Sequence, residues 1–118
     1  HLLAFERKLL ERQKDLCRRH DAPFLANAPG DIVGFALSTA GSQPLHGLRH
    51  PITEGSSGWY IWRGEFSCAA GFFEPICAWH LIEDCPECLQ FLGLDVGWRF
   101  LAHGDYEDVW YDETLLDV

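Results

Sequence analysis

Four side chains that commonly bind zinc occur within twelve residues, in the pattern Cys77-x2-His80-x4-Cys85-x2-Cys88. Thiolates and imidazoles are preferred zinc ligands, and a structural site normally holds four of them in a tetrahedron. Such sites gather ligands from two elements or a tight knuckle, and no glycine or turn precedes Cys77. We therefore expect no metal, with these thiols buried as small apolar groups. A metal-binding regulatory module remains the alternative.

The segment Cys85-Pro86-Glu87-Cys88 has the spacing of a redox-active dithiol. Such pairs lie where a helix starts after a strand, whereas here a helix is expected to precede, which argues against a redox role. The five cysteines are odd in number and irregularly spaced, so they do not form a complete disulfide framework. We expect reduced thiols in a cytoplasmic protein.

Local signatures of catalysis are absent from the sequence. It contains no G-x-S-x-G elbow, no H-E-x-x-H pair and no P-loop. Many carboxylates are present, but nothing singles out two of them as a glycosidase pair. The sequence therefore favours a protein that is not an enzyme and needs no cofactor, with an uncharacterised enzyme as an alternative.

Charge is unevenly distributed along the 118 residues, whose net charge is −9. Residues 1–20 hold six of the nine basic side chains, whereas residues 105–118 hold six carboxylates and no Lys or Arg. An acidic field repels nucleic acid and steers a basic protein partner towards itself. No run of apolar residues approaches the roughly 18 needed to cross a bilayer. We expect neither nucleic acid nor a membrane as a partner.

The periodicity predicts one α+β domain over residues 1–118. Residues 2–19 form an amphipathic helix (the helical region being 1–20), with one apolar sector of about 160°. A second helix is predicted from Glu74-Pro75, broken at Cys85-Pro86 and continuing to Leu92. Strands are predicted near 32–38, 58–63, 98–103 and 107–111. The helices should pack on an antiparallel sheet of at least these four strands.

Gly58-Trp59-Tyr60-Ile61-Trp62-Arg63 is the expected central strand, because large apolar groups fall on both of its faces. The turn Gly104-Asp105 predicts a hairpin between the last two strands. The stretch from Thr39 to Ser57 shows no regular period around His46, Arg49 and His50 and is predicted as a long loop. Arg49 there either binds an anion or pairs with a local carboxylate and tethers the loop.

Several motifs in series resemble those of the bacterial family known as immunity protein 33. The resemblance covers residues 32–118 and leaves the first helix outside. The motifs are Gly34-Phe35-Ala36-Leu37-Ser38, Pro44-Leu45-His46-Gly47-Leu48-Arg49-His50-Pro51, Gly58-Trp59-Tyr60-Ile61-Trp62-Arg63-Gly64-Glu65, Phe72-Phe73-Glu74-Pro75, His80-Leu81, Gly97-Trp98-Arg99-Phe100-Leu101 and Tyr106-Glu107-Asp108-Val109-Trp110-Tyr111-Asp112.

This resemblance implies a protein that neutralises a cognate toxin exchanged between competing bacteria, without catalytic residues of its own. Such inhibitors commonly cover the basic active-site cleft of a toxin with carboxylates. We expect an acidic C-terminal surface to bind the toxin, with an aromatic anchor between carboxylates and a second contact from the long loop. The candidate residues are Asp105, Glu107, Asp108, Trp110, Asp112, His46, Arg49 and His50.

Overall fold

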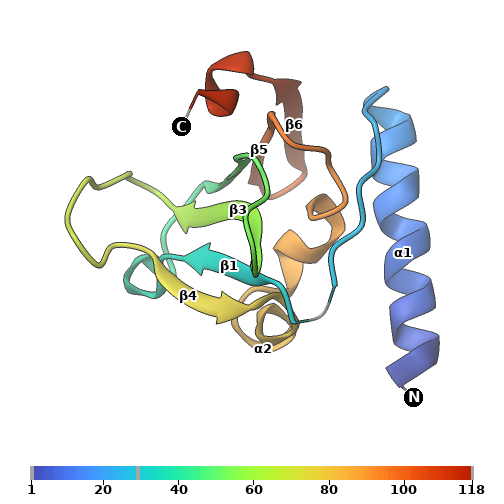
Figure 1. The fold of residues 1–118 in the computed structure, drawn as a ribbon, viewed down its shortest axis with the longest axis horizontal. Helices are drawn as coiled ribbons and strands as arrows, with labels where there is room; N and C mark the ends of the chain where they lie inside the picture. The colour runs from blue at the N-terminus through green and yellow to red at the C-terminus, as the bar shows by residue number, and fades with distance from the viewer. Residues whose placement is uncertain (1, 29, 118) are drawn as a thin grey trace.

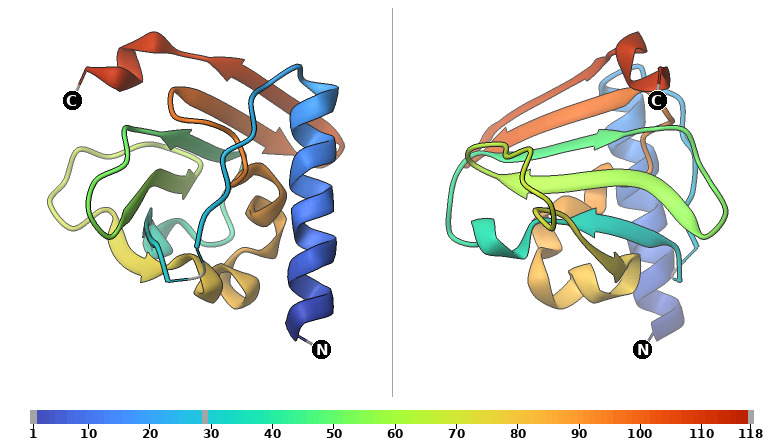
Figure 2. Two further views of the ribbon diagram at one scale, coloured as in Figure 1. Left: turned by 45° about the vertical axis from the view of Figure 1, so that its right-hand side comes forward. Right: turned by 60° about the vertical axis from the view of Figure 1, so that its left-hand side comes forward.

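The protein is built around one six-stranded sheet. The computed structural model describes residues 2–28 and 30–117. Its strands are β1 (Ile32–Phe35), β2 (Leu45–Arg49), β3 (Ser56–Arg63), β4 (Glu74–Cys77), β5 (Trp98–His103) and β6 (Tyr106–Tyr111). They lie in the order β4-β1-β3-β2-β5-β6 (Figure 2). Neighbouring strands are antiparallel except β1 and β3, which are parallel. The predicted α+β class is confirmed, with a mixed sheet in place of a wholly antiparallel one.

The helices lie on one face of this sheet. The long helix α1 (Leu2–Arg19) covers it together with α2 (Leu81–Asp84) and the 3₁₀ helices η2 (Ala78–His80) and η3 (Pro86–Phe91) (Figures 1 and 2). Two further 3₁₀ turns are η1 (Leu37–Thr39) and η4 (Glu113–Leu116). Gln13 of α1 donates a hydrogen bond to the Leu89 carbonyl of η3 (2.9 Å). In the described ranges, no helix combines the length and apolar content needed to span a bilayer.

The centre of the sheet follows the alternation expected from the sequence. Trp59 and Ile61 of β3 are buried beneath the helices, and Trp62 is only 5% exposed on the other side. The β5–β6 hairpin also forms as predicted, with His103 paired to Tyr106 across the turn. Gly104 adopts a φ of +60° in that turn, a conformation that glycine reaches without strain.

Residues 45–49 form strand β2, so the prediction of a continuous irregular loop was wrong. The buried positions of β2 are Leu45, Gly47 and Arg49. A glycine and an arginine at buried positions hide the apolar alternation by which strands are recognised. Gly47 is required there because a Cβ would lie 2.1 Å from the Phe100 ring. Phe100 in turn stacks on Phe91 of η3, with ring centroids 4.1 Å apart, and joins the sheet to the helical layer.

Residues 74–77 form strand β4, which corrects the expected helix start at Glu74-Pro75. Because β4 pairs only with β1, it is an edge strand, where the missing N–H of Pro75 is tolerated. The helical segment begins instead at Ala78 and is broken at Cys85 before Pro86, the predicted break. Strand β1 ends at Phe35 and not at residue 38, because Leu37–Thr39 turns into η1.

Candidate functional site

The sheet face opposite α1, α2 and η3, which we call the open face, collects polar and aromatic side chains from β2, β3, β5 and β6. Side chains alternate along each strand, so the cross-strand register decides which residues share this face. Figure 2, right, shows the six strands with α1 behind them. The strand members are His46, Leu48, Tyr60, Trp62, Arg99, Leu101, Asp108 and Trp110. His50, just after β2, and Asp112, just after β6, join them through contacts with Tyr60 and Arg99.

Trp62 lies within an aromatic cluster on the open face. The His46 ring stacks on it at 4.9 Å and 16°, and Phe66 and Phe73 approach edge-on at 5.4 and 6.0 Å. Burial, followed by the charge of Arg99, lowers the pKa of His46 below its usual value, so the stacked ring is held neutral. Phe66 is 55% exposed, which leaves one side of the cluster in contact with solvent.

A concavity of about 450 Å³ adjoins this cluster. Its lining includes His50, Tyr60, Trp62, Phe66, Phe73 and Leu115. The Nδ1 atom of His50 lies 2.8 Å from the Leu115 carbonyl of η4, which fixes the orientation of the imidazole. The Nε1–H of Trp62 has no hydrogen-bond partner among the described residues. A buried donor of this kind costs about 1–3 kcal/mol when it is left unsatisfied.

Arg99 and Asp112 form an ion pair beside the cluster. The Arg99 Nη1 atom lies 3.0 Å from Asp112 Oδ2, and the guanidinium lies over the Trp110 ring at 5.4 Å. Asp112 also accepts hydrogen bonds from the backbone N–H and the hydroxyl of Thr114, and so caps the start of η4. The Thr114 hydroxyl and then Arg99 lower the pKa of Asp112. This carboxylate is therefore already occupied by partners within the chain.

The structure brings five of the eight sequence-predicted residues to the open face, namely His46, His50, Asp108, Trp110 and Asp112. Asp105 is exposed in the β5–β6 turn at the edge of this face. Glu107 points to the helical face, where its carboxylate lies 3.0 Å from Arg19 and 2.6 Å from His20. Glu107 thus fastens the C-terminal end of α1 to β6.

Arg49 is fully buried on the helical face. Its guanidinium donates hydrogen bonds to the carbonyls of Ser57 (2.9 Å), Leu25 (3.0 Å) and Leu94 (2.6 Å), and to Asn27 Oδ1 (2.9 Å). Burial lowers the pKa of Arg49 to about 10, with Asp95 and Asp31 opposing that effect. Arg49 therefore tethers two connecting segments to the sheet through carbonyl and amide oxygens, whereas the sequence interpretation had it pair with a local carboxylate and tether its own loop.

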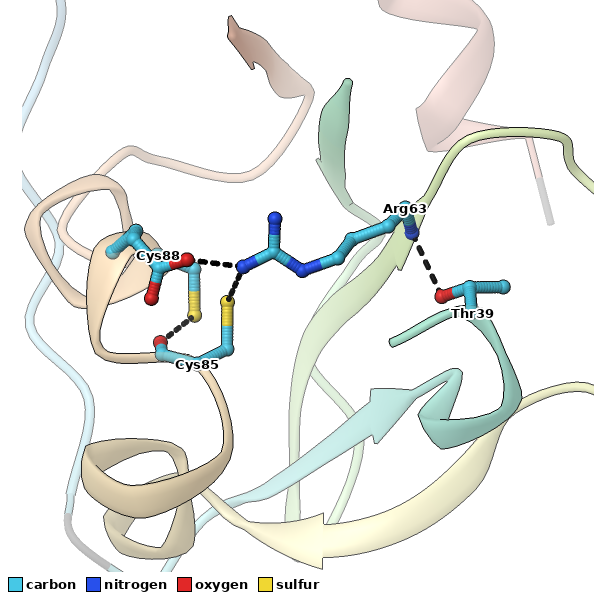
Figure 3. A network of polar contacts seen from close by, with 5 residues as sticks. Thr39, Arg63, Cys85 and Cys88 are labelled. Carbon is cyan, nitrogen blue, oxygen red and sulfur yellow. Dashed lines mark hydrogen bonds and ion pairs between the residues drawn. The ribbon is translucent and has the colours of Figure 1, made fainter. Parts of the chain in front are cut away.

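The zinc-competent side chains are divided in the structure. Cys77 ends β4 and His80 ends η2, whereas Cys85 and Cys88 lie together beneath Arg63 of β3 (Figure 3). Within residues 2–28 and 30–117, no three His, Cys, Asp or Glu side chains are grouped so as to hold a metal ion.

The aromatic cluster is the feature that sequence reasoning missed. The sequence predicts Tyr60 and Trp62 on a central strand but does not predict the rings that gather around them. The available signal was the aromatic pair Phe72-Phe73, together with Phe66, in the connection that follows β3. These rings contact one another and Trp62 across the edge of the open face.

Comparison with known families gives one match, in which the Imm33-like domain aligns with residues 12–112. The matched region includes all six strands and begins within α1, earlier than the start at residue 32 drawn from the motifs. No curated protein and no solved structure matches the chain.

Proposed function

This chain belongs to the Imm33-like domain family, an immunity-protein family whose partners are toxin proteins, and we propose that it neutralises one cognate antibacterial toxin by binding it stoichiometrically in the cytoplasm. Inhibition by occlusion needs a surface and no catalytic residue. The open face supports such a role, because it combines large aromatic groups with charged groups around them. This combination is typical of interfaces whose centre provides affinity and whose rim provides steering.

The observation that carries the proposal is the incomplete polar pairing of the open face. The Trp62 Nε1–H and the Arg99 Nε–H are buried, and neither has a hydrogen-bond partner in the part of the chain that the structure describes. Carbonyl or carboxylate oxygens of a docked toxin would satisfy these donors if binding moves the side chains that cover them. The concavity beside Trp62 then receives an apolar side chain of the toxin, and Trp110 provides a further aromatic contact.

Charge supports a basic surface on the toxin. Asp105, Asp108, Glu113 and Asp117 are exposed near the open face or at the C-terminal end of the chain. Asp108 is the open-face member of this group, since it pairs in register with Leu101. Such carboxylates act mainly on the association rate, which falls with rising salt. Glu107 and Arg49, which point to the helical face, do not contact the toxin in this arrangement.

The test is binding and growth protection with the toxin encoded beside this chain's gene. Wild-type protein should bind with one-to-one stoichiometry and restore growth when the two are co-expressed. Trp110→Ala should weaken binding at least tenfold, or about 1.4 kcal/mol. Asp108→Ala should slow association and flatten its salt dependence. Asp84→Ala makes the same charge change on an exposed residue of α2, behind the sheet, and should bind as wild type does.

Two outcomes would count against the proposal. If wild-type protein neither binds that toxin nor protects growth, the function is wrong. If protection holds but Trp110→Ala and Asp108→Ala bind as tightly and as fast as Asp84→Ala, the interface lies elsewhere. Circular dichroism and urea titration of each variant separate lost binding from lost folding.

A further inference from the structure

Cys85 and Cys88 occupy the first and last positions of a tight turn at the start of η3. Cys85 is the residue that precedes the helix, and its carbonyl accepts the backbone N–H of Cys88 at 3.2 Å. A turn closed in this way holds its end Cα atoms within about 7 Å. Disulfides usually join Cα atoms about 4.4–6.8 Å apart. The backbone of this turn can therefore accept a disulfide with little movement.

The Cys88 thiol is directed back towards Cys85 at the start of the turn. The Sγ–H of Cys88 lies 3.0 Å from the Cys85 carbonyl oxygen, to which it donates a hydrogen bond. Figure 3 shows both sulfur atoms on the side of the turn that faces Arg63. The exposed fraction of each cysteine is 0%.

Arg63 brings a positive charge to one of these sulfurs. Its Nη2 atom lies 3.4 Å from Cys85 Sγ, and the same guanidinium forms an ion pair with Glu87. The backbone N–H of Arg63 is held at 2.9 Å by the Thr39 hydroxyl, so the end of β3 is fixed where the side chain leaves it (Figure 3). A guanidinium beside a sulfur stabilises the thiolate, the form that reacts.

The two cysteines consequently differ in acidity. The neighbouring Cys88, followed by the positive charge of Arg63, lowers the pKa of Cys85 despite its burial. Burial raises the pKa of Cys88 well above its usual value. Cys85, which ionises more readily, is suited to attack first, and Cys88, which keeps its proton, is suited to act as the resolving cysteine.

We propose that Cys85 and Cys88 are a peroxide-reactive pair, in which hydrogen peroxide oxidises Cys85 and Cys88 then closes an intramolecular disulfide. The Cys85 thiolate attacks one peroxide oxygen, the O–O bond breaks, and the departing hydroxide takes up a proton as water, leaving a sulfenic acid. The Cys88 sulfur attacks the Cys85 sulfur, the S–S bond forms, and the S–O bond breaks. The thiol proton and the hydroxide leave as a second water. Two thiols and one peroxide thus give one disulfide and two waters.

Arg63, which is paired with Glu87, contacts the Cys85 sulfur, so movement of this ion pair would uncover it. The Glu87 side chain is 56% exposed and that of Arg63 is 11% exposed. An ion pair with an exposed partner contributes only about 0–1 kcal/mol, so it opens readily. Hydrogen peroxide is close to water in size and enters through a small opening, whereas a bulky alkylating reagent does not. Slow alkylation by a maleimide together with fast oxidation by peroxide is the combination that this geometry produces.

The other cysteines supply internal controls. Cys17 is buried, its pKa is raised by burial, and its thiol donates to the Gly93 carbonyl at 3.6 Å. Cys68 is exposed in the connection between β3 and β4. If exposure alone decided oxidation, Cys68 would react first. If the charge of Arg63 beside the sulfur decides the order of oxidation, Cys85 reacts first.

The experiment exposes the full-length chain to hydrogen peroxide, alkylates the remaining thiols after denaturation, and identifies each cysteine by peptide mass spectrometry. We expect the peptide containing Cys85 and Cys88 to lose two hydrogen atoms before Cys68 or Cys17 is modified. Cys88→Ser should trap Cys85 as a sulfenic acid that reacts with dimedone. The oxidation rate should rise with pH, with a midpoint below that of an ordinary thiol.

Two variants of the Arg63–Glu87 ion pair should change the rate in opposite directions, which a purely structural role would not produce. Arg63→Met should slow disulfide formation, by about threefold for each unit that the pKa of Cys85 rises, because fewer thiolates form but each is more nucleophilic. Glu87→Gln removes the nearby negative charge and should speed it, and this exposed position tolerates the change without a loss of folding. The proposal is overturned if Cys68 is oxidised before Cys85 in wild-type protein, or if Glu87→Gln leaves the rate unchanged or lowers it.

Discussion

Replacing Arg49 by methionine tests what holds the connecting segments against the sheet. Methionine keeps much of the apolar length of the side chain but removes every donor. It leaves the carbonyls of Ser57, Leu25 and Leu94 without the guanidinium that they now share. Because Arg49 is fully buried, water does not replace the lost bonds unless these segments separate.

The size of the effect follows from two opposing contributions. Hydrogen bonds to a charged group are each worth about 1.5–3 kcal/mol, but burying the guanidinium costs several kcal/mol, which the variant no longer incurs. Each buried carbonyl left unpaired costs about 1–3 kcal/mol, so we expect Arg49→Met to lose about 3–5 kcal/mol in all. Since small domains are stable by about 5–15 kcal/mol, the loss is a large share of the total.

The assay is urea unfolding followed by tryptophan fluorescence, with the free energy taken from the midpoint and slope. Arg18→Met is the matched control, because that side chain is 69% exposed and only pairs with Asp15 on the same helix. The control should change the free energy of unfolding by less than about 1 kcal/mol. Arg49→Lys keeps the positive charge but loses the planar set of guanidinium N–H donors, so this variant should also be clearly destabilised. A loss below about 1 kcal/mol in Arg49→Met would refute the tethering role.

Two further predictions use the same titration. Gly47→Ala should destabilise the protein by about 1–3 kcal/mol, because the new Cβ meets the Phe100 ring. Gly30→Ala is the control: no atom lies within 4 Å of its Cβ, so the free energy of unfolding should change by less than about 0.5 kcal/mol. Equal effects of the two substitutions would contradict the packing argument. The folded-state pKa of His46 is lowered, so the unfolded chain takes up the proton first. Stability should therefore fall as pH drops below about 6.5, and a His46→Gln variant that loses stability just as steeply would exclude His46 as the cause.

Elements were predictable from the sequence where each residue's type matches the environment that it occupies in the fold. Helix α1, the central strand β3 and the β5–β6 hairpin were predictable, since their apolar periodicity and turn residues agree with where they lie. Strand β2 was not, because its buried positions include Gly47 and Arg49. The burial of Arg49 is compensated by oxygens from residues far along the chain, and no local pattern reports them.

The candidate site was predictable in its residue types but not in its membership. Alternation along β6 correctly separates Asp108, Trp110 and Asp112 from Glu107. The face shared with His46 and His50 depends on β2 lying between β3 and β5, an order that the sequence does not reveal. The helix break at Cys85-Pro86 was predictable from Pro86, but the contact of Cys85 with Arg63 of β3 was not, because it joins residues 22 positions apart.

The packing of α1 against η3 joins segments that lie far apart in the sequence. Gln13 bonds to Leu89 and Cys17 to Gly93, in each case across 76 positions. During synthesis, α1 emerges first and must wait with its apolar side uncovered until η3 has been made. The parallel pair β1–β3 is likewise non-local, and contacts of this kind slow folding. The domain is therefore expected to fold late and as a whole, so a nascent chain that ends before residue 93 has no stable partner for its first helix.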